Sequence, residues 1–436
     1  MSKKAIIIGG GLAGLTSANF LAKANCEVIL LEKSRSPGGR AVTTNKNGIL
    51  FNLGPHALYR SGQAYRILRE LGIEFSGASP KVDGSLAIKD GRKHILPGGL
   101  TTLLKTSLLG FPAKFEVARL LASLPKMDAA SVNHLTVHEF LEREIRRADA
   151  RQLVQAFFRV ATYASDPQRQ SAGAALAQFQ MALKQSVVYL DGGWQTLVDG
   201  LRTKAEKAGV KFITEARAIK VERDLSSRVT GVRLADGNFL SASQVIIAAS
   251  PNEVCELIEN SEQTLLSEWM RKNIPVKAAC LDVALKYLPR PDNNFALGID
   301  QPLYLSVHSA TANLAPAGNA VIHVAKYLGS ENPADPKAVE DELEKLLDLV
   351  QPGWQSLVIE RRFMPSLTVS HDLVAAERGG LSGRANVEVP GIEGLYLAGD
   401  WVGSEGLLAD ASAASARRAA ELLINQEDRP ASARAA

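Results

Sequence analysis

The run Gly9-Gly10-Gly11-Leu12-Ala13-Gly14 places the strongest constraint on how this chain can fold. It follows a short apolar run, 5–8, and precedes a segment, 12–24, with apolar residues at helical spacing; a second apolar run follows at 28–31. A strand, a glycine turn, a helix and a strand in this order form a βαβ unit. Gly9 permits the tight turn, Gly11 lets the backbone approach a pyrophosphate, and Gly14 lets the helix lie close to the strand.

An acidic residue at the end of the second apolar run supports a dinucleotide as the ligand of this turn. Glu32, next to Lys33, stands where a carboxylate can accept hydrogen bonds from ribose hydroxyls. The first helix would offer its free N–H groups and the positive end of its dipole to the phosphates. The alternative, a glycine-rich turn without a ligand, does not account for Glu32. The sequence therefore predicts an α/β, Rossmann-type domain.

Two further motifs favour FAD over NAD as the dinucleotide. Gly38-Gly39-Arg40 follows Glu32 closely, so a loop can wrap the pyrophosphate and place a positive charge beside it. Near the other end, the apolar run 395–398 leads into Gly399-Asp400 and a small-residue helix. A carboxylate there can bind ribityl hydroxyls, and the start of the helix can face the flavin. The sequence contains no second G-x-G-x-x-G, so we expect no separate NAD(P) domain.

These motifs resemble those of the FAD-dependent superfamily that includes flavin amine oxidases, protoporphyrinogen oxidases and phytoene desaturases. The resemblance also covers Asp191-Gly192-Gly193-Trp194 and the run 245–251, but only loosely the remaining regions. It implies that Ala218 meets the adenine, that Leu408 and Ala409 begin a helix under the flavin, and that Gly54, Pro55 and His56 lie beside the flavin ring. The residues expected to bind the cofactor are Gly9, Gly11, Leu12, Ala13, Gly14, Glu32, Lys33, Gly38, Gly39, Arg40, Gly54, Pro55, His56, Ala218, Gly399, Asp400, Leu408 and Ala409.

We expect two domains built from alternating parts of the chain. A discontinuous FAD-binding domain takes residues 1–75, 188–255 and 385–424. A mixed α+β substrate domain takes 76–187, expected to be mostly helical, and 256–384. Asp236-Gly237 predicts a hairpin turn. The polar, Ala- and Arg-rich residues 425–436 read as a frayed tail.

The expected reaction is dehydrogenation of a hydrophobic organic substrate, desaturase-like or porphyrinogen-oxidase-like, by hydride transfer to flavin N5. Amine oxidation is an alternative, for which Lys277 is the candidate lysine beside the flavin. The non-catalytic interpretation of Lys277 is a solvated lysine on the face of a strand. His56 can orient a substrate or move a proton, or it can be structural. His308, His323 and His371 show no partner pattern and are taken as structural. A non-catalytic FAD-binding or escort protein is the rival from another class.

The composition limits the binding partners and the cellular location that we expect for this protein. A net charge of +4 gives little support for nucleic-acid binding, and three separated cysteines predict no metal site and fit a reducing cytoplasm. The electrons are expected to leave to dioxygen, a quinone or another acceptor. The segment 100–126 is leucine-rich and basic, which suits either an amphipathic helix on an anionic membrane surface or a helix packed on the substrate domain. A cytoplasmic protein, in the first case peripheral to a membrane, is the expectation.

Overall fold

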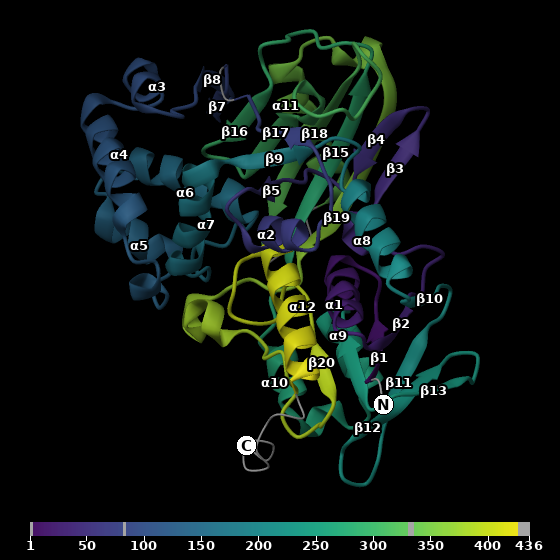
Figure 1. Ribbon diagram of the computed structural model, residues 1–436. Helices are drawn as coiled ribbons and strands as arrows, with labels where there is room; N and C mark the ends of the chain where they lie inside the picture. Colours follow the sequence, from purple (N-terminus) through teal and green to yellow (C-terminus); the bar gives the residue numbers. More distant parts are fainter. Residues whose placement is uncertain (1–2, 82–83, 330–334, 426–436) are drawn as a thin grey trace.

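A five-stranded parallel sheet joins segments from the whole length of the chain (Figure 1). The computed structural model describes residues 3–81, 84–329 and 335–425. The strand order is β10-β2-β1-β14-β20, and every neighbouring pair is parallel. The strands are β1 (Lys4–Ile8), β2 (Glu27–Leu31), β10 (Lys211–Ile213), β14 (Gln244–Ile247) and β20 (Leu395–Leu397). Because parallel strands end at one edge, residues 9, 32, 248 and 398 come together there.

Helices cover this sheet and bury its strands, which explains the continuous apolar runs in the sequence. α1 (Leu12–Lys23) packs against α8 (Gln195–Lys207) and α12 (Leu408–Ile424), and α12 also contacts α2 (Gln63–Glu70). Figure 1 shows α1 and α12, the first and last helices, side by side. The predicted βαβ unit is confirmed, and the five strands fall within the ranges expected for the FAD-binding domain.

A small antiparallel sheet extends from the same part of the chain. It consists of β11 (Ala218–Arg223), β12 (Val229–Leu234) and β13 (Phe239–Ser241). The predicted turn at Asp236-Gly237 joins the last two strands, and Gly237 has the positive φ of 89° that such a turn requires. β11 follows β10 closely, so its first residue lies near the end of β2.

A second, seven-stranded sheet forms the other part of the molecule. Its order is β19-β15-β18-β17-β16-β7-β8, antiparallel except between β16 and β7. The strands are β7 (Leu86–Lys89), β8 (Arg92–Ile95), β15 (Val276–Leu285), β16 (Phe295–Gly298), β17 (Leu303–Val307), β18 (Ala320–Leu328) and β19 (Val358–Ser370). α11 (Pro336–Val350) packs on this sheet through its buried apolar face. The fold is therefore the mixed α/β architecture expected from the sequence.

Five helices stand beside this sheet and share a second apolar core. They are α3 (Leu100–Lys105), α4 (Phe111–Ser123), α5 (Val137–Glu144), α6 (Ala148–Thr162) and α7 (Ala172–Gln185). The expectation of a single amphipathic helix over 100–126 is wrong. Thr106 and Gly110 separate two helices, and Pro112 is tolerated only because it stands in the first turn of the second.

The expectation that 76–187 is mostly helical is also wrong at its start, where strands come first. β7 and β8 form a hairpin around Asp90-Gly91, with φ values of 50° and 68°. These are the left-handed conformations of a two-residue hairpin turn, for which Asp-Gly is a strong signal. The same dipeptide predicted the hairpin turn at 236–237, so the hairpin turn at Asp90-Gly91 could also have been predicted from the sequence.

The remaining elements connect the two parts. They are β3 (Thr43–Lys46), β4 (Ile49–Asn52), β5 (Leu58–Tyr59), β6 (Gly77–Ala78), β9 (Val187–Leu190), α9 (Pro251–Leu257) and α10 (Leu265–Arg271). None of the helices in the described ranges is both long and apolar enough to cross a membrane. The tail predicted at 425–436 lies outside the described residues, apart from Asn425.

Candidate functional site

The glycine turn between β1 and α1 has the geometry of a cradle for an anionic group. Gly9 has a φ of 103° and donates its N–H to Leu31 O at 2.8 Å. A Cβ on Gly14 would lie 1.9 Å from Gly9 O, whereas a Cβ on Gly11 would meet nothing within 4 Å. Gly14 thus allows the helix to pack on the turn, and Gly11 leaves open space above it. No side chain caps the start of α1, so its first N–H groups remain available to phosphate.

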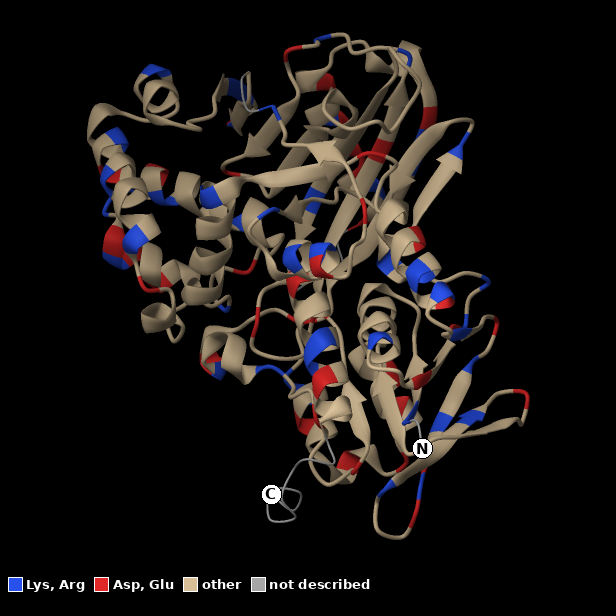
Figure 2. Ribbon diagram, viewed as in Figure 1, with Lys and Arg blue, Asp and Glu red and all other residues tan. Residues whose placement is uncertain are grey.

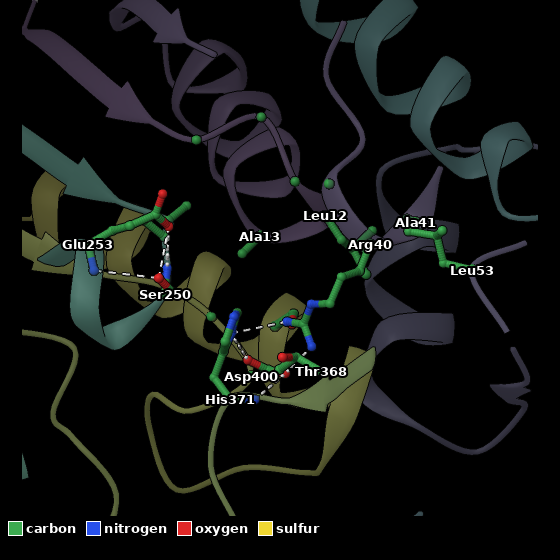
Figure 3. Close-up of a pocket in the computed structure, with 18 of the residues that line it drawn as sticks. Leu12, Ala13, Arg40, Ala41, Leu53, Ser250, Glu253, Thr368, His371 and Asp400 are labelled. Carbon is green, nitrogen blue, oxygen red and sulfur yellow. Dashed lines mark hydrogen bonds and ion pairs between the residues drawn. The ribbon is translucent and has the colours of Figure 1, made fainter. Parts of the chain in front are cut away.

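Glu32 is held rigidly at the end of β2. Its Oε2 accepts the N–H of Gly10 and its Oε1 accepts the N–H of Ser34, each at 2.8 Å. The carboxylate is buried, and each oxygen keeps a lone pair for a further donor such as a ribose hydroxyl. Lys33 forms an ion pair with Glu253 on α9, whose carboxylate also accepts the hydroxyl of Ser250 at 2.8 Å (Figure 3).

Arg40 and Asp400 form an ion pair in the lining of the site (Figure 3). Arg40 Nη1 lies 2.8 Å from Asp400 Oδ2 and 2.7 Å from the carbonyl oxygen of Val369. His371 adds its Nδ1, 2.9 Å from Asp400 Oδ1, and its backbone N–H, 3.2 Å from Oδ2. Despite burial, these neighbours hold the pKa of the Asp400 carboxyl well below its usual range. The expectation that His371 is merely structural is wrong, because the end of β19 brings it into this cluster.

The last helix begins at the same edge with strained backbone. Leu408 has a φ of 56°, a conformation that costs a residue other than glycine roughly 1–2 kcal/mol. No side chain caps this helix start. Ser415, about two helical turns further along on the buried face, accepts the Gly399 N–H at 2.9 Å and so ties the end of β20 to α12. The helix start is therefore a second fixed set of backbone donors, opposite the first.

One cavity of about 1080 Å³ joins these features. Of the predicted cofactor residues, those that line it are Gly9, Gly11, Leu12, Ala13, Glu32, Lys33, Gly39, Arg40, Pro55, His56, Ala218, Gly399, Asp400, Leu408 and Ala409. Gly14, Gly38 and Gly54 do not line it, which corrects their assignment as contact residues. Their role is steric: a Cβ on Gly38 would lie 2.6 Å from Val42, and one on Gly54 would lie 3.0 Å from Cys280.

Sequence reasoning missed the part of the cavity that the seven-stranded sheet contributes. These residues are Ala278 and Cys280 of β15, Ala325 of β18 and Leu367, Thr368 and Val369 of β19, with Ala57, Tyr163 and Trp194 from neighbouring segments. Only the alternation of side chains along β15 could have indicated them, and the face that points to the cavity depends on how the sheets pack. This end of the cavity is apolar.

His56 lines the cavity together with Pro55, Ala57 and Trp194, and its place beside the flavin ring stays a prediction. Its Nδ1 is 3.1 Å from the carbonyl oxygen of Gly54, which can only accept, so Nδ1 carries the proton of the neutral ring; the backbone of Arg40 also hydrogen-bonds to the imidazole. Its ring meets the edge of Trp194 at 4.9 Å between centroids. Burial lowers the pKa of His56 to about 4, so the imidazole is neutral at physiological pH.

Lys277 does not reach the cavity, so its candidate catalytic role is wrong. It is exposed, and its neighbours Val276 and Ala278 are buried. Because side chains alternate along a strand, Ala278 and Cys280 point to the cavity and Lys277 points away from it. The non-catalytic interpretation, a solvated lysine on the face of a strand, describes this residue.

His308 and His323 are structural, as expected. His323 Nδ1 lies 2.6 Å from Asp282 Oδ1, and Arg362 Nη2 lies 2.6 Å from Asp282 Oδ2. His323, Asp282 and His308 are almost completely buried. The negative charge of Asp282 is compensated inside the second sheet by the guanidinium of Arg362. In the described part of the chain, no group of three or more His, Cys, Asp or Glu residues is arranged to hold a metal ion.

The profile of the family described as flavin containing amine oxidoreductase matches residues 12–276. The chain belongs to this family. Membership makes FAD the cofactor and oxidoreductase the class, and the residues fit FAD: an open glycine cradle, two uncapped helix starts and a buried, ionised Asp400. FAD, when bound, supplies the redox centre, the N5 atom of its ring.

Two curated proteins and one solved structure are similar to this chain. Phytoene desaturase of Cercospora nicotianae is 27% identical over 275 residues, 56% of this chain and 44% of the relative. Coproporphyrinogen III oxidase of Staphylococcus aureus is 28% identical over 165 residues, 36% of this chain and 32% of the relative. The chain thus matches less than half the length of these two relatives. An oxidoreductase from Methanosarcina mazei has the same fold, with a TM-score of 0.75 and 18% identity, covering 96% of this chain and 100% of that one.

Proposed function

We propose that the protein dehydrogenates an extended, hydrophobic organic substrate in a desaturase-like reaction. FAD held by the glycine turn and Asp400 would supply the hydride acceptor for such a dehydrogenation, in which one substrate carbon would lose a hydride, the adjacent carbon a proton, and a C=C bond would form. The observation that carries this proposal is the apolar end of the cavity. Every cavity side chain that the seven-stranded sheet contributes is uncharged.

Most charged side chains of the cavity lie near the dinucleotide-binding motifs, and the Arg40–Asp400 ion pair lies beside the carbonyl oxygen of Val369 on β19. Glu32 and Lys33 follow β2, Glu253 and Glu256 belong to α9, and Arg217 precedes β11. A porphyrinogen would need cationic groups to meet its carboxylates, and an amine oxidase site typically has a lysine beside the flavin. Arg40, the cation that reaches Val369, is already paired with Asp400, and no lysine lines this end; both observations support an apolar substrate over a porphyrinogen or an amine.

His56 has the chemistry to take part in the proton step. Its imidazole is neutral, and its Nδ1 proton is committed to Gly54. It lines the cavity between Pro55 and Ala57, beside Trp194. We infer that the apolar lining orients the substrate and excludes water, while the neutral imidazole of His56 serves as a proton acceptor in the cavity.

Anaerobic reduction of the FAD-loaded protein tests the proposal. A polyene such as phytoene in lipid vesicles, a porphyrinogen and a primary amine are each added without oxygen, and loss of the oxidised flavin absorbance is followed. The polyene is expected to bleach the flavin and to gain a double bond, detected by chromatography. Bleaching by the porphyrinogen or the amine alone would contradict the substrate class. No bleaching by any of the three would favour a non-catalytic FAD-binding protein. Reoxidation by dioxygen or by a quinone then identifies the electron acceptor.

A further inference from the structure

Two short helices expose large apolar side chains on the side away from the core. Leu100 and Leu104 of α3 are 68% and 59% exposed, and Phe111 and Phe115 of α4 are 78% and 67% exposed. Each pair is spaced by four residues, so its members stand on one face of their helix. Other residues of the same helices, Leu103, Ala113, Val117 and Leu120, already fill the core beneath. The four outer side chains therefore contribute nothing to the core and form a surface of their own.

The two helices and the neighbouring hairpin form one continuous surface. Lys114 Nζ lies 2.8 Å from the carbonyl oxygen of Leu104, which ties α4 to the end of α3. The hydroxyl of Thr106 donates to the carbonyl oxygen of Ile95 at 2.6 Å, so β8 adjoins them, and Ile95 is 43% exposed. Figure 1 shows α3 and α4 at the outer edge of the molecule, far from α1 and α12. We call Ile95, Leu100, Leu104, Phe111 and Phe115 the apolar edge.

The charges of the segment that carries the apolar edge are almost all positive, whereas Figure 2 shows both signs on the helices beside α3. The cations of residues 92–126 are Arg92, Lys93, Lys105, Lys114, Arg119 and Lys126, and Glu116 is the one acidic residue among them. Glu116 Oε2 accepts the backbone N–H groups of Arg146 and Arg147, each at 3.1 Å, and both of these arginines are exposed. A second copy of this face would bring like charges together. An anionic lipid surface meets both the apolar side chains and the cations.

We propose that the apolar edge inserts into the headgroup region of an anionic membrane and holds the protein there peripherally. Phe111 and Phe115 enter the boundary of the acyl chains, while Lys105 and the neighbouring cations meet lipid phosphates. This binding does not depend on which substrate the cavity takes, so the two proposals can fail separately.

Vesicle co-sedimentation tests this surface with the full-length, FAD-loaded protein. The protein is expected to sediment with vesicles of phosphatidylcholine and phosphatidylglycerol. Much less protein is expected to sediment with vesicles of phosphatidylcholine alone. Phe111→Ser with Phe115→Ser is expected to weaken binding by about tenfold or more for each side chain. Lys105→Gln is expected to weaken binding to the anionic vesicles roughly fivefold. Leu225→Ser with Tyr287→Ser, which removes exposed apolar groups elsewhere, is the matched control and is expected to bind as the wild type does.

A second variant covers the case in which the serine substitutions disturb folding. Phe115→Trp keeps an aromatic side chain at the edge, and brominated lipids are expected to quench its added fluorescence. Equal binding of the Phe111/Phe115 variant and the wild type, or an unquenched tryptophan, would overturn the proposal. A concentration-dependent dimer that these serine substitutions abolish would overturn it too, because the edge would then serve a second copy of the chain.

Discussion

Arg40 Nη1 lies 2.8 Å from Asp400 Oδ2, although the two residues are separated by most of the chain. Asp400 is almost fully buried, whereas the Arg40 side chain is 37% exposed and turned partly to the cavity. The pair connects the loop after β2 with the end of β20, so the two segments predicted to hold the diphosphate and the flavin side of FAD contact each other directly. His371 completes the contact from β19.

Loss of the charge at Asp400 tests this coupling. Asp400→Asn is expected to weaken FAD binding and to lower the free energy of unfolding by about 1–3 kcal/mol, since a charge-assisted hydrogen bond is lost. Flavin fluorescence on titration of the apoprotein and chemical denaturation measure the two effects. Lys46→Gln, which breaks the exposed pair with Glu360, is the control and should cost less than about 1 kcal/mol.

The same carboxylate predicts a pH dependence with a definite sign. The pKa of Asp400 is depressed in the folded protein, so its contribution to stability is complete above the unfolded-state pKa of about 4. This contribution is lost only as the pH falls below that value toward the folded-state pKa. Denaturation of wild type and Asp400→Asn between pH 7 and 3 should therefore show a difference that shrinks at the acid end. A difference that grows there would contradict the assignment.

Gly11 and Gly14 are expected to respond differently to the same substitution. Gly11→Ala adds a methyl group where the protein has open space, so the apoprotein should keep its stability but bind FAD about tenfold or more weakly. Gly14→Ala places the methyl group against Gly9 O and should lower the free energy of unfolding by about 1–3 kcal/mol. Thermal unfolding of both apoproteins, with FAD titration, separates the effects. A loss of stability in Gly11→Ala would show that the turn has no open cradle.

Lys277 and Ala278 test which face of β15 meets the substrate. Lys277→Met is expected to leave the rate of flavin reduction unchanged, because the lysine is exposed and points away from the cavity. Ala278→Lys places an ammonium in the apolar end and should abolish reduction by a polyene, since an unpaired buried charge is costly. Stopped-flow spectra of both variants, at equal flavin content, give the comparison. Slower flavin reduction in Lys277→Met than in the wild type would show that the lysine takes part in the reaction.

Burial of His56 predicts that stability falls on acidification. Its pKa drops from 6.5 to about 4 on folding, so between these values the unfolded chain binds a proton that the folded chain does not. The free energy of unfolding of the apoprotein should therefore decrease as the pH falls through this window. His56→Gln should reduce this slope but not remove it, because burial also lowers the pKa of His308. His138→Gln, on the exposed side of α5, is the control; an unchanged slope in His56→Gln would contradict the burial.

Most of the cofactor site could be predicted from the sequence, because its parts are formed by residues that lie close together along the chain. A glycine turn, the start of a helix and the end of a strand are built from neighbouring residues, so Gly9 to Gly14 and Glu32 could be recognised from their order alone. Arg40 and Asp400 were each predicted separately, but their ion pair required the two ends of the chain to meet. His371 had no local signal, because its role arises from where β19 ends.

The amino-acid sequence by itself determined the βαβ unit, the FAD motifs and the basic, leucine-rich segment 100–126. Tertiary structure alone decided that Ala278 rather than Lys277 faces the cavity, and that Phe111 and Phe115 face outward while Val117 faces the core. The physical reason is that period and propensity are properties of neighbouring residues, whereas the face that is buried depends on what packs against it from distant segments.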